Sequence, residues 1–195
     1  MFLAPRRFGF TPVRLLAFLS ALSLGLVAYA QGDYIRELPA VGVTTAPKID
    51  GELSPAEWPD AARYDKFIDG DTLVVSDERG EFWLTYTKDA IYFAGRVTTD
   101  PRRIIADEYR DNVSLEGNDN MRLNIDPFGQ GTNFNSFATN ASGATSINLA
   151  GGRAAKTEWL GEITAQGRKT ETGWQFEMRI PWGIMALPQG GVKDP

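Results

Sequence analysis

The sequence predicts an all-β fold, an antiparallel β-sandwich of the jelly-roll kind. Two stretches carry this prediction, because residues 120–126 and 174–180 alternate apolar and polar side chains with period two. Such alternation marks antiparallel strands that turn one face to a core and the other to solvent. A third observation is that clusters of Gly, Pro and Asn separate several segments of this type, which is typical of a sandwich or a barrel.

The amino terminus has the features of a secretory signal peptide. Three arginines flank the start of an apolar run over residues 15–27, and Ala28-Tyr29-Ala30 offers a small-residue cleavage site. The run is shorter than the roughly 20 residues of a membrane-spanning helix, which is the alternative interpretation. We therefore predict that residues 1–30 direct export to the periplasm, the outer membrane or the extracellular space. Residues 31–47 are predicted to be an extended N-terminal segment.

The predicted sandwich occupies residues 48–195 and begins with a turn and a short helix. Residues 48–51 read Lys-Ile-Asp-Gly, a turn signal. Ser54 and Glu57 have the spacing of a capping box, with a proline between them at the first helical position. We expect Trp58 to anchor the core, because burying a large apolar side chain contributes roughly 1.5–3 kcal/mol.

The remaining strands follow from the same alternation. We expect an edge strand and a loop within residues 61–76, and a hairpin over residues 81–98. A polar segment runs from Asp100, a natural helix or turn start before proline, to Asn118. The later strands are expected at residues 120–126, 133–140, 144–149, 159–166 and 174–180, the last two as a hairpin that turns within residues 169–173.

The chain ends on residues 188–195, which contain Pro and Gly and no further strand pattern. A sandwich edge without its partner strand would be exposed there, and proteins normally avoid this. We therefore expect that the sandwich lacks its C-terminal strand and that the protein continues downstream.

The composition excludes several kinds of chemistry. The chain has no His and no Cys, so it lacks the usual base of Ser-His-Asp catalysis, a thiol nucleophile and the commonest zinc ligands. Removing residues 1–30 takes away three of the 20 basic side chains and none of the 25 acidic ones, which leaves a net charge of −8. That charge argues against nucleic acid as a partner. We predict no catalytic residues in this chain.

Oxygen-bearing side chains are dense between residues 107 and 119. Hard oxygen ligands bind calcium in irregular loops, and a structural ion suits an exported domain without disulfides. The alternative is a polar loop that needs no metal. The sequence thus predicts a structural calcium ion, with the candidate ligands Asp107, Asp111, Asp119 and Asp126.

A sugar site on a sandwich combines a flat aromatic ring with planar polar side chains. The segment 133–140 is rich in asparagine, whose amide offers both donors and an acceptor. The alternative is that these amides only complete turns and strand edges. The candidate carbohydrate-binding residues are Arg122, Asn124, Asn133, Asn135 and Tyr109.

Four motifs stand in an order that resembles a known family. They are Lys48-Ile49-Asp50-Gly51-Glu52-Leu53 with Glu57-Trp58, Ala90-Ile91-Tyr92-Phe93-Ala94 with Thr99-Asp100-Pro101, the segment 118–126, and the segment 173–182. This order is similar to the family 9 carbohydrate-binding module, and most of all to the variant at the N-terminus of bacterial outer-membrane β-barrel proteins. The resemblance implies a β-sandwich that binds a polysaccharide or an oligosaccharide.

The chain also departs from the glucan-binding members of that family. Those members carry Trp just before the position of Asp119, where this chain has Glu116-Gly117-Asn118. They have Glu where Arg122 stands and Arg near Ala138, and their second stacking Trp lies beyond Pro195. The resemblance therefore implies the fold more fully than it implies the sugar clamp.

We predict an exported carbohydrate-binding module within a longer protein that acts in glycan binding or carbohydrate catabolism. One alternative is an interaction domain, without sugar affinity, of an outer-membrane β-barrel protein whose barrel follows in the same chain. A second alternative is a haem-binding sandwich, in which only Met121 or Met178 would be available to the iron, both on predicted core faces. These residues are not predicted to form an enzyme, and a hydrolase or barrel domain would belong to the full-length protein.

Overall fold

The computed structural model describes residues 39–69, 71–72, 79–150 and 163–188. The predicted signal peptide, residues 159–162 and the C-terminal tail lie outside these residues. The described strands are β1 (Val41–Gly42), β2 (Ala62–Tyr64), β3 (Arg79–Tyr86), β4 (Ala90–Thr98), β5 (Asn120–Ile125), β6 (Asn135–Asn140), β7 (Thr145–Asn148), β8 (Thr164–Thr170) and β9 (Gly173–Pro181). The described helices are the 3-10 turns η1 (Pro55–Glu57), η2 (Pro101–Arg103) and η4 (Trp182–Ile184), and none of them is long and apolar enough to cross a membrane.

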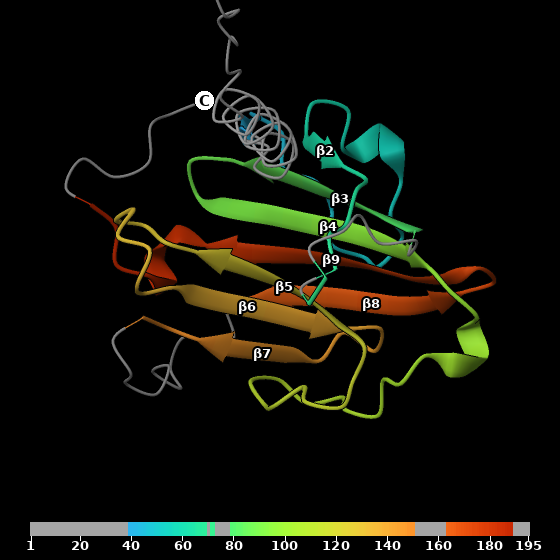
Figure 1. Cartoon of the computed structure of the whole chain (residues 1–195). Helices are drawn as coiled ribbons and strands as arrows, with labels where there is room; N and C mark the ends of the chain where they lie inside the picture. The colour runs from blue at the N-terminus through green and yellow to red at the C-terminus, as the bar shows by residue number, and fades with distance from the viewer. Residues whose placement is uncertain (1–38, 70, 73–78, 151–162, 189–195) are drawn as a thin grey trace, which may run out of the picture. The chain divides into compact units, whose positions relative to one another are not determined.

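These strands form two sheets (Figure 1). The larger sheet has the order β1-β3-β4-β9-β8, with β2 also paired to β3, and the smaller sheet has the order β5-β6-β7. Neighbouring strands run antiparallel, except that β1 runs parallel to β3. The long pairing of β4 with β9 joins two segments far apart in the sequence, so the larger sheet depends on both halves of the chain.

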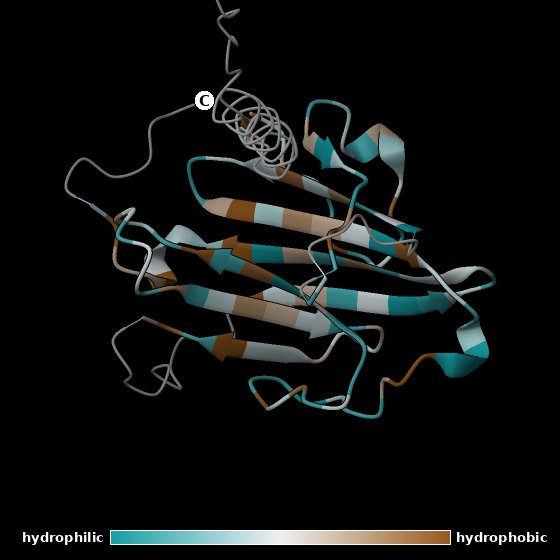
Figure 2. Ribbon diagram, in the orientation of Figure 1, coloured by the Kyte–Doolittle hydropathy of each residue, from teal (hydrophilic) through white to brown (hydrophobic). Residues whose placement is uncertain are grey.

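The core lies between the two sheets and consists of the apolar positions of the alternating strands. Phe137 of the smaller sheet packs against Ile91, Met178 and Ile180 of the larger one, and all four side chains are buried. Figure 2 shows the alternation as brown and teal bands along the strands. Two sheets that share one core confirm the predicted β-sandwich.

The strand predictions are correct in type and differ in their ends. The hairpin over residues 81–98 is β3 and β4, and the edge strand within residues 61–76 is β2. The last hairpin is present and turns at residues 171–172, within the predicted turn, but β8 continues past the predicted end to Thr170, which pairs with Gly173. Strand pairing with β9 keeps this polar segment extended, although its sequence resembles a turn.

One local prediction is wrong. Ser54 is the N-cap of η1, but its side chain makes no capping hydrogen bond. The helix is a single 3-10 turn, and the Glu57 carboxylate lies 3.7 Å from Lys48 Nζ. The reciprocal capping box therefore does not form. Trp58, which follows η1, is buried as predicted.

The segment 41–61 covers the outer face of the larger sheet. Leu53 and Trp58 form a buried cluster with Trp83 and Tyr92, which project from β3 and β4 away from the other sheet. The middle of the larger sheet, over β3, β4 and β9, is thus covered on both faces, although the alternation alone predicts that one face meets solvent. The predicted extended segment contributes β1, which pairs with β3 at the edge of the larger sheet.

Gly167 of β8 lies where the two sheets meet. A Cβ atom at this position would clash with the carbonyl oxygen of Asn140 and the backbone nitrogen of Gly143. Only glycine leaves room for this approach of backbone to backbone. The contact fixes the end of β6 against β8.

Candidate carbohydrate-binding surface

The outer face of the smaller sheet carries polar side chains at the regular spacing of its strands. We call the set Arg122, Asn124, Ser136 and Asn148 the polar face. Asn124 pairs with Ser136, and Ser136 with Asn148, across the three strands. The side chains of Arg122, Asn124 and Asn148 are exposed. Arg122 donates a hydrogen bond from Nη1 to Ser136 Oγ at 3.1 Å, and it forms no ion pair with a carboxylate of the described residues.

The loop of residues 104–119 covers the other end of this outer face. Ala138 is the register partner of Arg122 and faces the same way. Leu115 of the loop packs on Ala138 and Ala144, and all three are buried. This end of the face is therefore closed to a ligand, and only the polar face remains open.

Asn140 fastens the covering loop to the sheet. Its Nδ2 donates to Glu108 O at 2.8 Å and to Asn118 Oδ1 at 3.0 Å. Its Oδ1 accepts from Ser142 N at 2.9 Å and from Ala144 N at 3.0 Å. The side chain is fully buried and its hydrogen-bonding capacity is used by the fold.

Tyr109 lies in the covering loop and not on the sheet, with 75% of its surface exposed. The preceding residue, Glu108, forms an ion pair with Arg110 at 2.7 Å. The hydrogen bond from the Arg110 side chain, together with backbone hydrogen bonds, lowers the pKa of Glu108 to about 2. Tyr109 thus belongs to the covering loop, whereas Arg122 and Asn124 belong to β5.

A cavity of about 400 Å³ lies beside the loop that joins β5 to β6, and we call it the β5–β6 cavity. Its polar lining includes Gln130, Asn133 and Asn135, and its apolar lining includes Phe128 and Met185. Asn135 is almost completely buried, at 3% exposure, and its Oδ1 accepts a hydrogen bond from Ala150 N at 2.9 Å.

Asp126 shapes the loop that borders this cavity. Its carboxylate accepts hydrogen bonds from Gly131 N at 2.6 Å and from Phe128 N at 3.1 Å. The backbone hydrogen bond from Gly131 is the largest of the effects that lower the pKa of Asp126. Gly129 and Gly131 adopt positive φ angles, which few other residues tolerate.

The candidate calcium ligands do not gather in the described part of the chain, where no three acidic side chains are close enough to hold a metal ion. Asp119 Oδ2 accepts from Ile105 N at 2.8 Å, and Asp111 Oδ1 accepts from Thr145 Oγ1 at 3.1 Å. Asp107 is exposed. These carboxylates serve turns and loops, and calcium binding stays a prediction.

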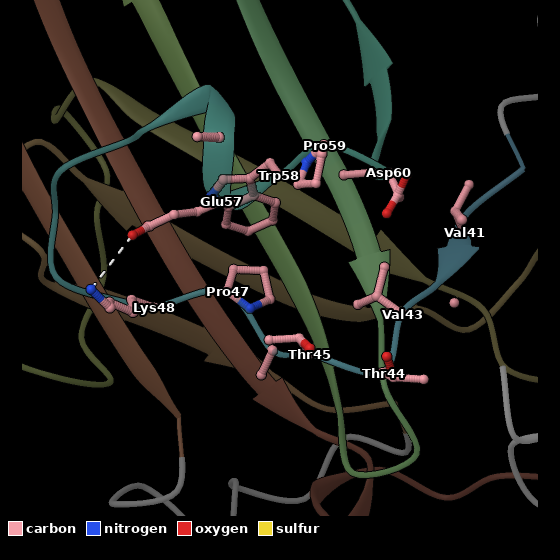
Figure 3. Close-up of a pocket in the computed structure, with 14 residues that line it drawn as sticks. Val41, Val43, Thr44, Thr45, Pro47, Lys48, Glu57, Trp58, Pro59 and Asp60 are labelled. Carbon is pink, nitrogen blue, oxygen red and sulfur yellow. Dashed lines mark ion pairs between the residues drawn. The ribbon is translucent and has the colours of Figure 1, made fainter.

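A larger cavity, about 710 Å³, lies within the segment that covers the larger sheet, between residues 41–48 and residues 56–61 (Figure 3). Its charged groups include Lys48 and Glu57, which pair with each other. The aromatic ring in its lining belongs to Trp58, which is 3% exposed and therefore offers little stacking surface. This lining is less suited to a sugar than that of the β5–β6 cavity.

Glu177 of β9 is fully buried under the covering segment of the larger sheet. Its Oε2 accepts from the backbone nitrogens of Asp50 and Gly51, each at 3.0 Å, and its Oε1 accepts from Trp58 Nε1 at 3.3 Å. Burial raises the pKa of Glu177, and the three hydrogen bonds oppose that rise. The carboxylate holds the segment in place, and no open surface reaches it.

The structure thus divides the five predicted sugar-binding residues among three places. Arg122 and Asn124 share the polar face, Asn133 and Asn135 line the β5–β6 cavity, and Tyr109 is exposed in the covering loop. Sequence reasoning did not single out the exposed aromatic residues of the β5–β6 loop, Phe128 and Phe134. A usable signal was present, because a phenylalanine within a Pro- and Gly-rich turn has no core to enter.

No family model and no curated protein matches the sequence significantly. Solved structures do match. One is a family 9 carbohydrate-binding module from Caldicellulosiruptor kristjanssonii in complex with cellotriose, with a TM-score of 0.54 and 16% identity over 80% of this chain and 68% of that chain. The same kind of module from that organism, in complex with glucose, gives a TM-score of 0.54 and 15% identity over 78% and 72%.

A third match is a proposed carbohydrate-binding protein from Bacteroides uniformis, with a TM-score of 0.56 and 16% identity over 80% of this chain and 78% of that chain. At such identities the similarity establishes the fold. The chain therefore has the fold of family 9 carbohydrate-binding modules, as the order of its four motifs implies. The outer-membrane context of the resemblance stays a prediction.

Proposed function

We propose that this domain binds saccharides without catalysis, through the polar face of the smaller sheet. The observation that carries the proposal is the position of Arg122, an exposed guanidinium beside Asn124 with no described carboxylate to neutralise it. A guanidinium offers five N–H donors in one plane, and an amide offers donors and an acceptor. Sugar hydroxyl groups need this combination.

Phe134 is the stacking surface in this proposal. It immediately precedes β6 and is 48% exposed. Side chains of a strand alternate between faces, so continuing the alternation from Ser136 places Phe134 on the same side as the polar face. An exposed aromatic ring packs against the apolar face of a sugar ring, while the polar groups bind its hydroxyls.

The expected affinity is low. Ala138 is buried under Leu115 at the place where the resembled glucan-binding modules carry an arginine. Each lost contact of about 1.4 kcal/mol weakens binding tenfold. We therefore expect dissociation constants in the millimolar range for short oligosaccharides.

We also propose that the domain is exported and belongs to a longer protein. The pattern of residues 1–30 and the family resemblance support this proposal. The competing function is an interaction domain of an outer-membrane protein without sugar affinity.

Calorimetric titration of the domain with cellotriose and glucose tests the proposal, because fold relatives were solved with these two ligands. Arg122→Ala should weaken binding about tenfold, since a hydrogen bond from a charged group contributes roughly 1.5–3 kcal/mol. Arg103→Ala is the matched control, an exposed arginine of η2. It should leave binding unchanged.

The outcomes separate the interpretations. The absence of binding heat with cellotriose, glucose and xylotriose would reject sugar binding and favour the interaction domain. Binding that Arg122→Ala does not weaken would move the site away from the polar face.

A further inference from the structure

We propose a second saccharide subsite in the β5–β6 cavity, one that takes a single neutral sugar ring. It shares its ligand class with the proposed function but uses different residues. The cavity, about 400 Å³, falls in the size range of small-molecule sites. Such sites combine an apolar lining with a few well-placed polar groups, as this one does.

The side-chain amide of Asn135 is the strongest support for this subsite, because only its oxygen has a hydrogen-bond partner among the described residues. Its oxygen must face Ala150 N, because a backbone N–H group donates and needs an acceptor. Its Nδ2 is then left, and among the described residues no group accepts a hydrogen bond from it. Among the described residues, Glu57 Oε2 is the only buried side-chain atom without a partner, so Asn135 Nδ2 keeps contact with the open space of the cavity. Asn135 is 3% exposed and lines the cavity, so a ligand oxygen there would satisfy this donor.

The rest of the lining indicates the ligand. Phe128 is 54% exposed and supplies an aromatic surface. Gln130 and Asn133 are exposed and add two primary amides, each with donors and an acceptor. A molecule with an apolar face and a rim of hydroxyl groups matches both features, and a sugar ring is such a molecule.

The charges of the lining favour a neutral ligand. The lining contains no lysine or arginine among the described residues. Its one carboxylate belongs to Asp126, whose oxygens already accept Phe128 N and Gly131 N. An anionic sugar would find no cation to pair with and would be repelled by Asp126.

Methyl NMR of the domain titrated with D-glucose tests the proposal, since Met185 and Ile184 line the cavity and report on it. We expect saturable shifts of these two methyl signals. Phe128→Ala removes the stacking ring and should weaken the binding that they report about tenfold. Ile105→Ala is the control, an apolar side chain of similar exposure (50%) in the covering loop and outside the cavity lining, and it should leave these shifts unchanged.

Asn135→Asp tests the amide donor. The new carboxylate keeps an acceptor for Ala150 N and loses the Nδ2 donor, so the fold is retained while the ligand contact is lost. We expect about tenfold weaker binding at the Met185 methyl, in a variant whose methyl spectrum remains that of a folded protein and whose melting temperature is lower, because the new carboxylate is almost buried. D-glucuronate, the same ring with a carboxylate, should bind at least about fivefold more weakly than glucose.

Two results would overturn the subsite. One is the absence of a saturable shift at Met185 and Ile184. The other is a shift that neither Phe128→Ala nor Asn135→Asp weakens. Sugar binding at the polar face is tested separately from this subsite. Arg122→Ala should weaken the calorimetric binding of cellotriose without changing the shifts that glucose causes at Met185.

Discussion

The two outer faces of the sandwich differ in how far other segments of the chain cover them. On the larger sheet, residues 41–61 cover the face, and the polar group beneath them, Glu177, has three hydrogen-bond donors directed at it. On the smaller sheet, the loop of residues 104–119 covers only one end. There Arg122 and Asn124 keep hydrogen-bonding groups toward solvent.

In this fold, the polar groups that stabilise the structure are different from those that are available for binding. A buried polar group whose capacity is used by the protein fixes a segment and has nothing left for a ligand. A polar group with unused capacity contributes little to folding and is available for binding. Glu177 and Asn140 belong to the first kind, and Arg122 to the second.

The largest expected effect comes from removing the anchor of the covered face. Glu177→Ala leaves three N–H donors without an acceptor, and we expect a loss of at least about 3 kcal/mol in the free energy of unfolding. Urea denaturation measures it. Glu52→Ala is the control, because this exposed acid only pairs with Arg168, and its loss should stay under about 0.5 kcal/mol. Equal effects of the two variants would show that the covered face does not depend on Glu177.

A smaller loss is expected when the cover of the other face is loosened. Leu115→Ala removes a buried side chain from a small cluster, so we expect a loss of roughly 2 kcal/mol, at the low end for such substitutions. Amide exchange at Val113, whose N–H bonds Thr145 O at 3.0 Å, should accelerate as well. Glu116→Ala, an exposed change in the same loop, should alter neither quantity. Unchanged exchange in Leu115→Ala would mean that polar contacts alone hold the loop.

The pH dependence of stability sharpens the description of the covered face. Burial raises the pKa of Glu177 above its ordinary value of 4.5, so the folded protein binds this proton more tightly than the unfolded chain. The stabilisation by this proton is complete below the unfolded pKa and is lost as the pH rises through the folded pKa. Relative to Glu177→Gln, the original protein should therefore lose stability as the pH rises from the ordinary pKa of 4.5 through the raised pKa of the folded state. Parallel stability curves for the two proteins would contradict the raised pKa.

The smallest expected effect concerns calcium at the loop of the partly open face. With few carboxylates close together, a site there would be weak. We expect saturating calcium to raise the melting temperature by about 2–4 °C relative to chelator, the shift that about 1 kcal/mol produces in a domain of this size. Asp111→Asn should abolish the shift. Melting curves that coincide in calcium and chelator would show that the loop is only a solvated acidic surface.

Period-two alternation made the strands predictable. Apolar positions of residues 174–180 and 120–126 point into the core as expected, because a strand presents every second side chain to one face. Alternation does not predict burial where a further segment packs on the outer face of the larger sheet. Trp83 and Thr85 are buried although they face away from the core between the sheets, because residues 41–61 lie over them, and no local pattern encodes that packing.

The candidate site was predictable by residue type and not by grouping. Arg122 and Asn124 are two residues apart on one strand, so the sequence places them on one face. Asn135 stands in an equally polar segment, but as the neighbour of Ser136 it points to the opposite face of β6. It lines a cavity together with Met185, which comes from a distant segment of the chain. Such a cavity arises from contacts between segments far apart in sequence, which spacing does not reveal.

Local pattern and composition are therefore enough to predict the fold class, the strands and the absence of histidine and cysteine chemistry. Which polar groups remain available for a ligand depends instead on the packing of segments that are far apart in the sequence. Asn140, Asn135 and Asn133 lie within one short segment, yet the first is fully hydrogen-bonded, the second half-used and the third exposed. Their roles differ because hydrogen-bond partners come from the loops that pack on each of them, and packing places those loops.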